Sequence, residues 1–134
     1  MVPDEARALY AEGLVLAEAG DLAEAFLTIE RAVQVFPDYS EACKTLARLS
    51  AETNEIRAFQ NWCHEAARID PKDPEPYWML GDLLGRQGRR EEAMEALRRG
   101  LAMRPLGDGM RERLEARLRE VELAPAGKGW RRTL

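Results

Sequence analysis

The sequence predicts an all-α protein, an array of about seven helices paired into antiparallel hairpins. Ala, Leu, Glu and Arg dominate the 134 residues, and all four favour helices. No stretch alternates apolar and polar residues as a strand would. Pro37, Pro71 and Pro105 each follow an apolar helical run and lie 34 residues apart. Because proline lacks an amide hydrogen and restricts the residue before it, this spacing predicts three helical units of equal length.

Small or flexible residues recur at fixed distances before each proline. In order of decreasing distance from the proline, the recurring sets are Gly13, Ala47 and Gly81; Gly20, Asn54 and Gly88; Ala25, Phe59 and Ala93; and Ala32, Ala66 and Gly100. Small side chains allow two helix backbones to approach closely, whereas Gly and Asn can take positive φ where a helix ends. The pattern therefore predicts two closely packed helices and a turn in each unit.

This 34-residue pattern resembles the tetratricopeptide repeat over about residues 6 to 105. The third unit matches best, with Trp78, Leu80, Gly81, Leu84, Gly88, Ala93, Leu97 and Pro105; the first matches well, with Leu9, Gly13, Leu16, Gly20, Ala25, Ile29, Ala32 and Pro37. The second is degenerate, with Phe59 where a small residue is expected and Ser50 where a large one is expected. The resemblance implies a right-handed superhelical array, with repeats at about 6–39, 40–73 and 74–107 in a domain of residues 1–107.

Each helix can be placed from its start and stop signals. The expected helices span about residues 4–19, 22–35, 38–53, 55–69, 73–87, 89–103 and 108–123. Aspartates are expected to cap five of these helices, at Asp4, Asp21, Asp38, Asp73 and Asp108. The helices should end where a glycine, an asparagine or a proline follows them.

The seventh helix, residues 108–123, is expected to be amphipathic and to cap the array. Its apolar residues are Met110, Leu114, Leu118, Val121 and Leu123, and its other positions are mostly Arg and Glu. The same pattern suits a membrane-surface or partner helix, but charges of both signs at short spacing favour a cap. Residues 124–134 are expected to be disordered; within them, Trp130 among Lys128, Arg131 and Arg132 is either a docking motif or packs back onto the array.

The resemblance implies that the first helix of each hairpin lines a concave groove. The candidate partner-binding residues in it are Tyr10, Leu14, Lys44, Arg48, Trp78, Met79 and Asp82. Apolar side chains beside a basic pair suit an extended or helical peptide that carries an acidic residue among apolar ones. The alternative for Tyr10 and Trp78 is a structural role, packing on neighbouring helices. The family's mode of gripping a terminal carboxylate is not expected, because Tyr10 and Leu14 replace the Lys and Asn that it needs.

Other functional classes find little support in the sequence. No Ser–His–Asp set, phosphate loop or metal-ligand cluster is present, so neither an enzyme nor a metal or other cofactor is expected. The net charge of −4 and the lack of a basic stripe argue against nucleic acid. Cys43 and Cys63 are expected to be buried, reduced thiols. Without a membrane-spanning segment or signal peptide, the expected location is cytoplasmic.

The function expected from the sequence is therefore that of a protein-binding adaptor or scaffold. A small bacterial secretion-type chaperone is the alternative, since the resemblance includes such proteins of similar length. Self-assembly is a further alternative, because residues 1–39 carry a net charge of −6 and residues 108–134 a net charge of +2. This asymmetry would allow weak, salt-sensitive association of identical chains. The identity of the partner does not follow from the sequence.

Overall fold

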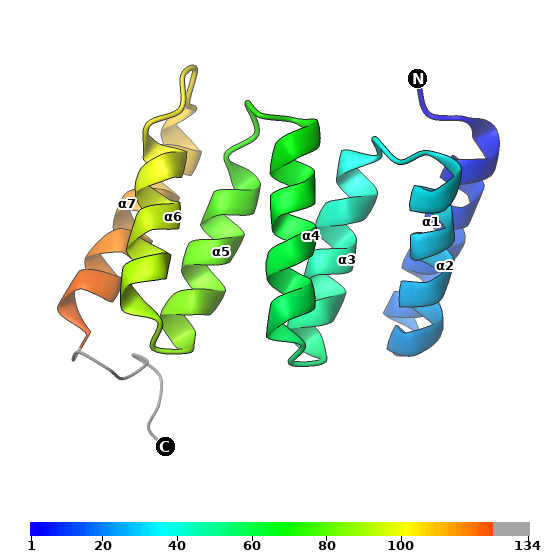
Figure 1. Ribbon diagram of the computed structural model, residues 1–134, viewed down its shortest axis with the longest axis horizontal. Helices are drawn as coiled ribbons and strands as arrows, with labels where there is room; N and C mark the ends of the chain where they lie inside the picture. Colours follow the sequence, from blue (N-terminus) through cyan, green and yellow to red (C-terminus); the bar gives the residue numbers. More distant parts are fainter. Residues whose placement is uncertain (125–134) are drawn as a thin grey trace. The chain divides into compact units, whose positions relative to one another are not determined.

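The computed structural model describes residues 1–124, and every regular element in that range is an α-helix (Figure 1). The helices are α1 (Asp4–Glu18), α2 (Leu22–Val35), α3 (Ser40–Glu52), α4 (Ile56–Ile69), α5 (Glu75–Arg86), α6 (Arg90–Leu101) and α7 (Asp108–Leu123). The predicted all-α class and the seven helices are confirmed, with ends within two residues of those expected. The expectation for the Trp130 segment lies outside the described residues.

The helices form two compact units. Unit 1, Met1–Asp70, contains the hairpins α1–α2 and α3–α4, and α2 also packs on α3. Unit 2 begins at Pro71 and contains the hairpin α5–α6, with α7 packed on α6 and on α5. Each unit buries its own apolar side chains between helices, as expected where short amphipathic helices cannot bury them alone.

The turns inside the three hairpins use the residues that the repeat pattern predicts. Gly20, Asn54 and Gly88 have φ values of 90°, 60° and 78°, and they are the positive-φ residues among residues 1–124. A residue with a Cβ pays a steric cost in this region, which glycine avoids and asparagine tolerates. The sequence signal for a tight helix–helix turn is therefore confirmed in all three hairpins.

The helix caps differ from the prediction. Asp4 and Asp108 are the first residues inside α1 and α7, where Pro3 and Gly107 are the N-caps, and α3 is preceded by Tyr39 rather than Asp38. Carboxylates in a first turn still favour a helix through its dipole, so the sequence preference is real although the position is one residue off.

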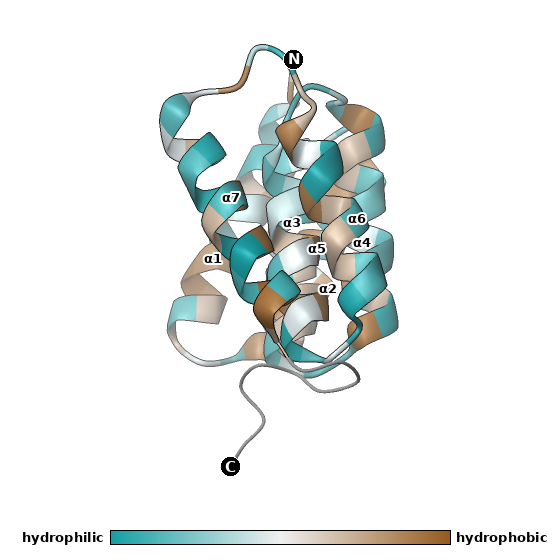
Figure 2. Cartoon of the chain, turned by 90° about the vertical axis from the view of Figure 1, so that its left-hand side faces the viewer, coloured by the Kyte–Doolittle hydropathy of each residue, from teal (hydrophilic) through white to brown (hydrophobic). Residues whose placement is uncertain are grey.

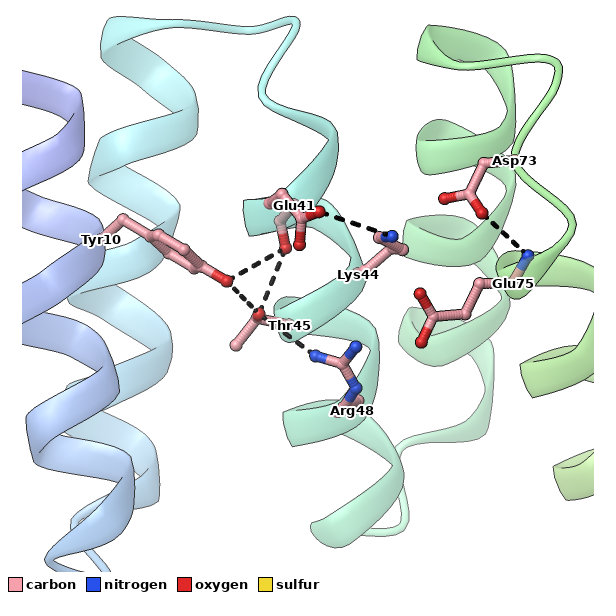
Figure 3. Close-up of polar contacts among 7 residues, drawn as sticks. All are labelled: Tyr10, Glu41, Lys44, Thr45, Arg48, Asp73 and Glu75. Carbon is pink, nitrogen blue, oxygen red and sulfur yellow. Dashed lines mark hydrogen bonds and ion pairs between the residues drawn. The ribbon is translucent and has the colours of Figure 1, made fainter. Parts of the chain in front are cut away.

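Two further caps show how far the prediction holds. Asp21 lies at the N-cap of α2 without a side-chain cap bond, and so its predicted capping interaction is wrong. Asp73 does cap: its Oδ1 accepts a hydrogen bond of 3.0 Å from the Glu75 amide (Figure 3).

Small residues permit the close helix contacts within each unit. A Cβ added at Gly13 would overlap the Ile29 side chain across the α1–α2 hairpin, and one added at Gly81 would overlap Leu97 across α5–α6. Ile29 and Leu97 are both fully buried. Glycine is therefore required at these two positions because a large side chain of the second helix lies against the first helix's backbone.

The second hairpin fills the equivalent space with other residues. Ala47 replaces the glycine on α3, and Cys63 replaces the large residue that faces it on α4. Phe59, four residues before Cys63, replaces the alanine found in the other two repeats. All three side chains are buried, with Phe59 only 2% exposed. In the degenerate repeat, the large buried side chain of the second helix is thus Phe59, which lies one helical turn before the position of the large residue in the other two repeats.

Candidate partner-binding site

In unit 1, the candidate residues lie on α1 and α3, and Tyr10 connects these two helices. Its hydroxyl oxygen is 2.8 Å from Thr45 Oγ1 and 3.5 Å from the Glu41 carbonyl oxygen (Figure 3). Its ring packs against Tyr39, with 5.2 Å between ring centroids. Buried hydroxyls usually need such partners, so Tyr10 joins the two hairpins of unit 1 whatever else it contacts.

The basic pair on α3 divides into a buried and an exposed cation. The Lys44 residue is only 7% exposed, and its Nζ lies 3.7 Å from a Glu41 carboxylate oxygen. Arg48 is exposed and donates a hydrogen bond of 3.4 Å to Thr45 Oγ1 (Figure 3). Leu14, one turn after Tyr10 on α1, is 39% exposed. Of the candidates in unit 1, the more exposed side chains are therefore Leu14 and Arg48, whereas Lys44 is buried.

In unit 2, Trp78 of α5 lies beneath two arginines of α7. The Arg113 Cζ is 4.4 Å and the Arg117 Cζ 5.7 Å from the centroid of the indole ring. Both distances are within the range of cation–π attraction. Figure 2 shows α7 as a helix of mixed teal and brown segments, which fits its packing on one side and its charge on the other. The contact explains the partial burial of Trp78 and gives it a structural role in holding α7.

Asp82 strengthens the same contact between α5 and α7. Its Oδ1 is 3.1 Å from Arg117 Nε and 3.3 Å from Arg86 Nε, so one carboxylate joins both helices. Arg117 also pairs with Glu120 of its own helix. Met79, the remaining candidate on α5, is only 7% exposed. The candidates of unit 2 therefore lie together on α5, but Asp82 and Met79 mainly stabilise the packing within the unit.

Arg113 is a residue of this site that the sequence interpretation did not single out. It is exposed, and among residues 1–124 its one recorded interaction is the stacking on Trp78. A guanidinium stacked on an aromatic ring keeps its donor edge free for a carboxylate. The four-residue spacing of Arg113 and Arg117 places both on one face of a helix, but only the fold shows that this face covers Trp78.

The cysteines are free thiols buried in the second hairpin, as expected. Burial raises the pKa of Cys43 to about 11 and that of Cys63 to about 12, which keeps both thiols protonated at neutral pH. Within residues 1–124, no group of three or more His, Cys, Asp and Glu side chains is placed to hold a metal ion. None of the helices in the same range is long and apolar enough to cross a membrane.

Two family models match the chain, and both are described as tetratricopeptide repeat. One matches residues 16–80 and the other residues 74–105. Together they cover residues 16–105, which is more than half of the 134 residues. The matched ranges include the degenerate second repeat.

The chain is also similar to known proteins. It is 28% identical over 72 residues to the protein CTR9 homolog of Arabidopsis thaliana; the match covers 54% of this chain but only 7% of that much longer protein.

Two solved structures share the fold. The Yersinia enterocolitica type III secretion chaperone SycD, in complex with a peptide of the translocator YopD, has a TM-score of 0.79 and 17% identity, over 90% of this chain and 95% of that one. The first repeat domain of Spaghetti (RPAP3), bound to an HSP90 peptide, has a TM-score of 0.74 and 17% identity, over 88% and 90%.

Proposed function

The chain belongs to the tetratricopeptide repeat family, and from this premise we propose that it is a protein-interaction module that binds a peptide or helical segment of a partner protein. The binding residues are those on the first helices of the hairpins, predicted as Tyr10, Leu14, Lys44, Arg48, Trp78, Met79 and Asp82, with Arg113 of α7 added. Each unit presents its own face. The partner segment carries acidic residues among apolar ones.

The observation that carries this proposal is the pairing of an accessible cation with apolar surface in each unit. Unit 1 presents Arg48 on α3 together with the partly exposed Leu14 on α1. Unit 2 presents Arg113 stacked on Trp78. Arginines held by neighbouring side chains lose little further entropy when they bind a carboxylate. An acidic and apolar peptide would satisfy both kinds of surface.

Two of the similar structures support a peptide as the ligand. The SycD structure contains a YopD peptide, and the RPAP3 structure contains an HSP90 peptide. A secretion-type chaperone is the second candidate function, favoured by the size match, since the chain covers 95% of the SycD chain. Both candidates are non-enzymatic and need no cofactor, and a cytoplasmic location belongs to the same proposal. Neither nucleic acid nor membrane insertion has a role in it.

The test is affinity capture from the native host, read by mass spectrometry, with variants that change one face at a time. Arg48→Glu alters the face of unit 1, and Arg113→Glu alters that of unit 2. Val15→Glu is the control, because Val15 is 65% exposed on α1 and is not among the candidates. We expect a partner that the wild type and the control capture and that both arginine variants lose by about tenfold or more. A partner captured equally by all four proteins would overturn the proposed site.

Trp78 needs a separate design because it also holds α7. Trp78→Phe keeps an aromatic ring under Arg113 but removes the indole, whereas Trp78→Ala removes the support altogether. If Trp78 contributes directly to binding, Trp78→Phe weakens capture while the melting temperature stays close to that of the wild type. Equal losses of binding and melting temperature would assign Trp78 to structure alone.

A further inference from the structure

Two apolar cavities of unit 1 are lined by residues that are not among the partner-binding candidates, one by α2 and the end of α3 and the other by α2 and α4. The first has a volume of about 310 Å³ and is lined by Leu22, Ala23, Phe26, Leu27, Leu49, Thr53 and Glu55. The second, of about 350 Å³, is lined by Val33, Pro37, Asn61, Trp62 and Glu65. Phe26 of the first cavity and Trp62 of the second touch edge to face, with 6.4 Å between their centroids. Each cavity therefore contributes one ring to an aromatic contact between α2 and α4.

The first cavity has the properties of a site for a large apolar side chain next to a cation. Its walls are mostly leucine and phenylalanine, and Leu27 is 56% exposed at its edge. Glu55 is its one charged lining residue and is exposed, and within residues 1–124 it forms no ion pair. In the second cavity, by contrast, Glu65 is already paired with Arg68 at 2.6 Å. The first cavity is thus the one that offers both apolar surface and a carboxylate without a cation partner.

The chain itself contains a segment of matching chemistry. Residues 125–134 have the sequence PAGKGWRRTL, in which Trp130 lies among Lys128, Arg131 and Arg132, and no acidic residue is present. Trp and Arg are the residue types that most often anchor interfaces, because they bury large surfaces and form directed hydrogen bonds.

Charge favours the same match. Unit 1 holds thirteen acidic and six basic residues, a net charge of −7, whereas residues 125–134 carry +3. The helices that form the cavities are also acidic: residues 21–35 and 55–69 together hold five carboxylates and three arginines. Opposite charges steer association and fix its register.

The end of α7, which directly precedes this segment in the sequence, is bonded to α6. Arg90 of α6 donates hydrogen bonds of 2.7 Å to the Glu122 carbonyl and 3.3 Å to the Ala124 carbonyl, at the end of α7. These bonds satisfy carbonyls that the helix leaves unpaired. They hold the C-terminal end of α7 on α6.

We propose that the first cavity of unit 1 binds the segment Pro125–Leu134 of a second copy of this chain, with Trp130 in the cavity and its neighbouring arginines near Glu55. The contact is heterologous, because the cavity of one copy receives the segment of the next. Its lining residues come from α2, the end of α3 and Glu55, and none of them is among the partner-binding residues proposed above. It gives the predicted weak self-association a defined surface.

Sedimentation equilibrium of the full chain tests this proposal. At near-millimolar protein and about 50 mM NaCl, we expect an apparent mass above the 15.2 kDa of one chain, falling towards that value at about 500 mM NaCl. Trp130→Ala and Leu27→Glu should each remove the association, since one lacks the anchor and the other places a charge at the cavity edge. Val15→Glu, an equal change at an exposed valine of α1, should not. Circular dichroism verifies that each variant remains folded.

A synthetic peptide with the sequence of residues 124–134 separates the segment from the rest of the chain. The peptide should bind to the Trp130→Ala chain. Adding Leu27→Glu to that chain should raise the Kd of the peptide by about tenfold or more. A wild-type mass of 15.2 kDa at every concentration would overturn the proposal, even if the peptide binds, because the segment would then occupy its own chain's cavity or none. Association that survives both Trp130→Ala and Leu27→Glu would overturn it as well.

Discussion

The second and third hairpins fill the same space between two helices in different ways. In the third, Gly81 of α5 receives the buried side chain of Leu97, and Ala93 lies one turn earlier on α6. In the second, Ala47 of α3 stands opposite Cys63 of α4, and Phe59 lies one turn earlier. The large side chain has moved by one helical turn, and the glycine has become alanine where the facing residue is small. Each hairpin therefore buries one large side chain from its second helix, but the position of that side chain differs by one turn.

The largest effect should come from removing the ring that is specific to the second hairpin. Phe59→Ala should lower the free energy of unfolding by about 3–5 kcal/mol, because it empties a fully packed position. Chemical denaturation followed by circular dichroism measures the loss. Adding Cys63→Leu and Ala47→Gly to Phe59→Ala should recover part of it, since the three positions then match Ala93, Leu97 and Gly81 of the third hairpin. Strictly additive effects of the three changes would show that these positions do not share volume.

The reverse exchange in the third hairpin should cost less. Gly81→Ala places a Cβ against the Leu97 side chain, and the strain should lower the free energy of unfolding by about 1–3 kcal/mol. Leu97→Cys in the Gly81→Ala background reproduces the pairing of Ala47 with Cys63. The loss of unfolding free energy in the double variant should therefore be smaller than the sum of the losses in the two single variants. If Gly81→Ala alone leaves the denaturation midpoint unchanged, the packing described for this hairpin is incorrect.

A smaller difference is expected at the turns of the same hairpins. Gly88→Ala forces an alanine to a φ of 78° and should destabilise the chain by about 1–2 kcal/mol. Asn54→Gly should change stability by only about 0.5 kcal/mol or less, because the steric cost removed is offset by the greater freedom of glycine in the unfolded chain. Thermal melts of both variants measure the difference. Equal effects at the two turns would contradict the role assigned to positive φ.

The smallest expected effect is a loss of stability in alkaline solution. It comes from the second hairpin, which contains both thiols. Burial raises the pKa of Cys63 to about 12, so the folded state binds this proton more tightly than the unfolded state does. The stability that this thiol contributes is complete below its unfolded pKa near 9.0 and is lost as pH rises towards its folded value. Denaturation midpoints of the wild type should therefore fall more steeply above about pH 9 than those of Cys63→Ala. Parallel curves would exclude a raised pKa at this thiol.

Much of this fold could be predicted because its signals are local. The spacing of Pro37, Pro71 and Pro105 defined the repeat, and Gly20 and Gly88 marked turns that glycine needs for its backbone conformation. The caps were less predictable, because an aspartate near a helix start is favoured at several adjacent positions.

The candidate site could be predicted only in part, since the state of each side chain depends on helices far away in the sequence. Nothing local shows that the Tyr10 hydroxyl meets Thr45, or that Lys44 is buried beside Glu41. Arg113 became a candidate only once α7 was placed over Trp78. Which of these residues a partner touches stays a prediction.

The tryptophans offer an optical consequence of how the two units are built. Trp62 belongs to unit 1 and touches Phe26, whereas Trp78 belongs to unit 2 and lies under guanidinium groups. With Trp130 changed to phenylalanine, each unit would carry a single tryptophan in a distinct environment. Fluorescence emission would be followed during denaturation of this variant and of variants that keep only Trp62 or only Trp78. The variants with one tryptophan would report the unfolding of each unit separately. Coincident transitions would mean that the halves melt cooperatively, and separate ones that the array comes apart in stages.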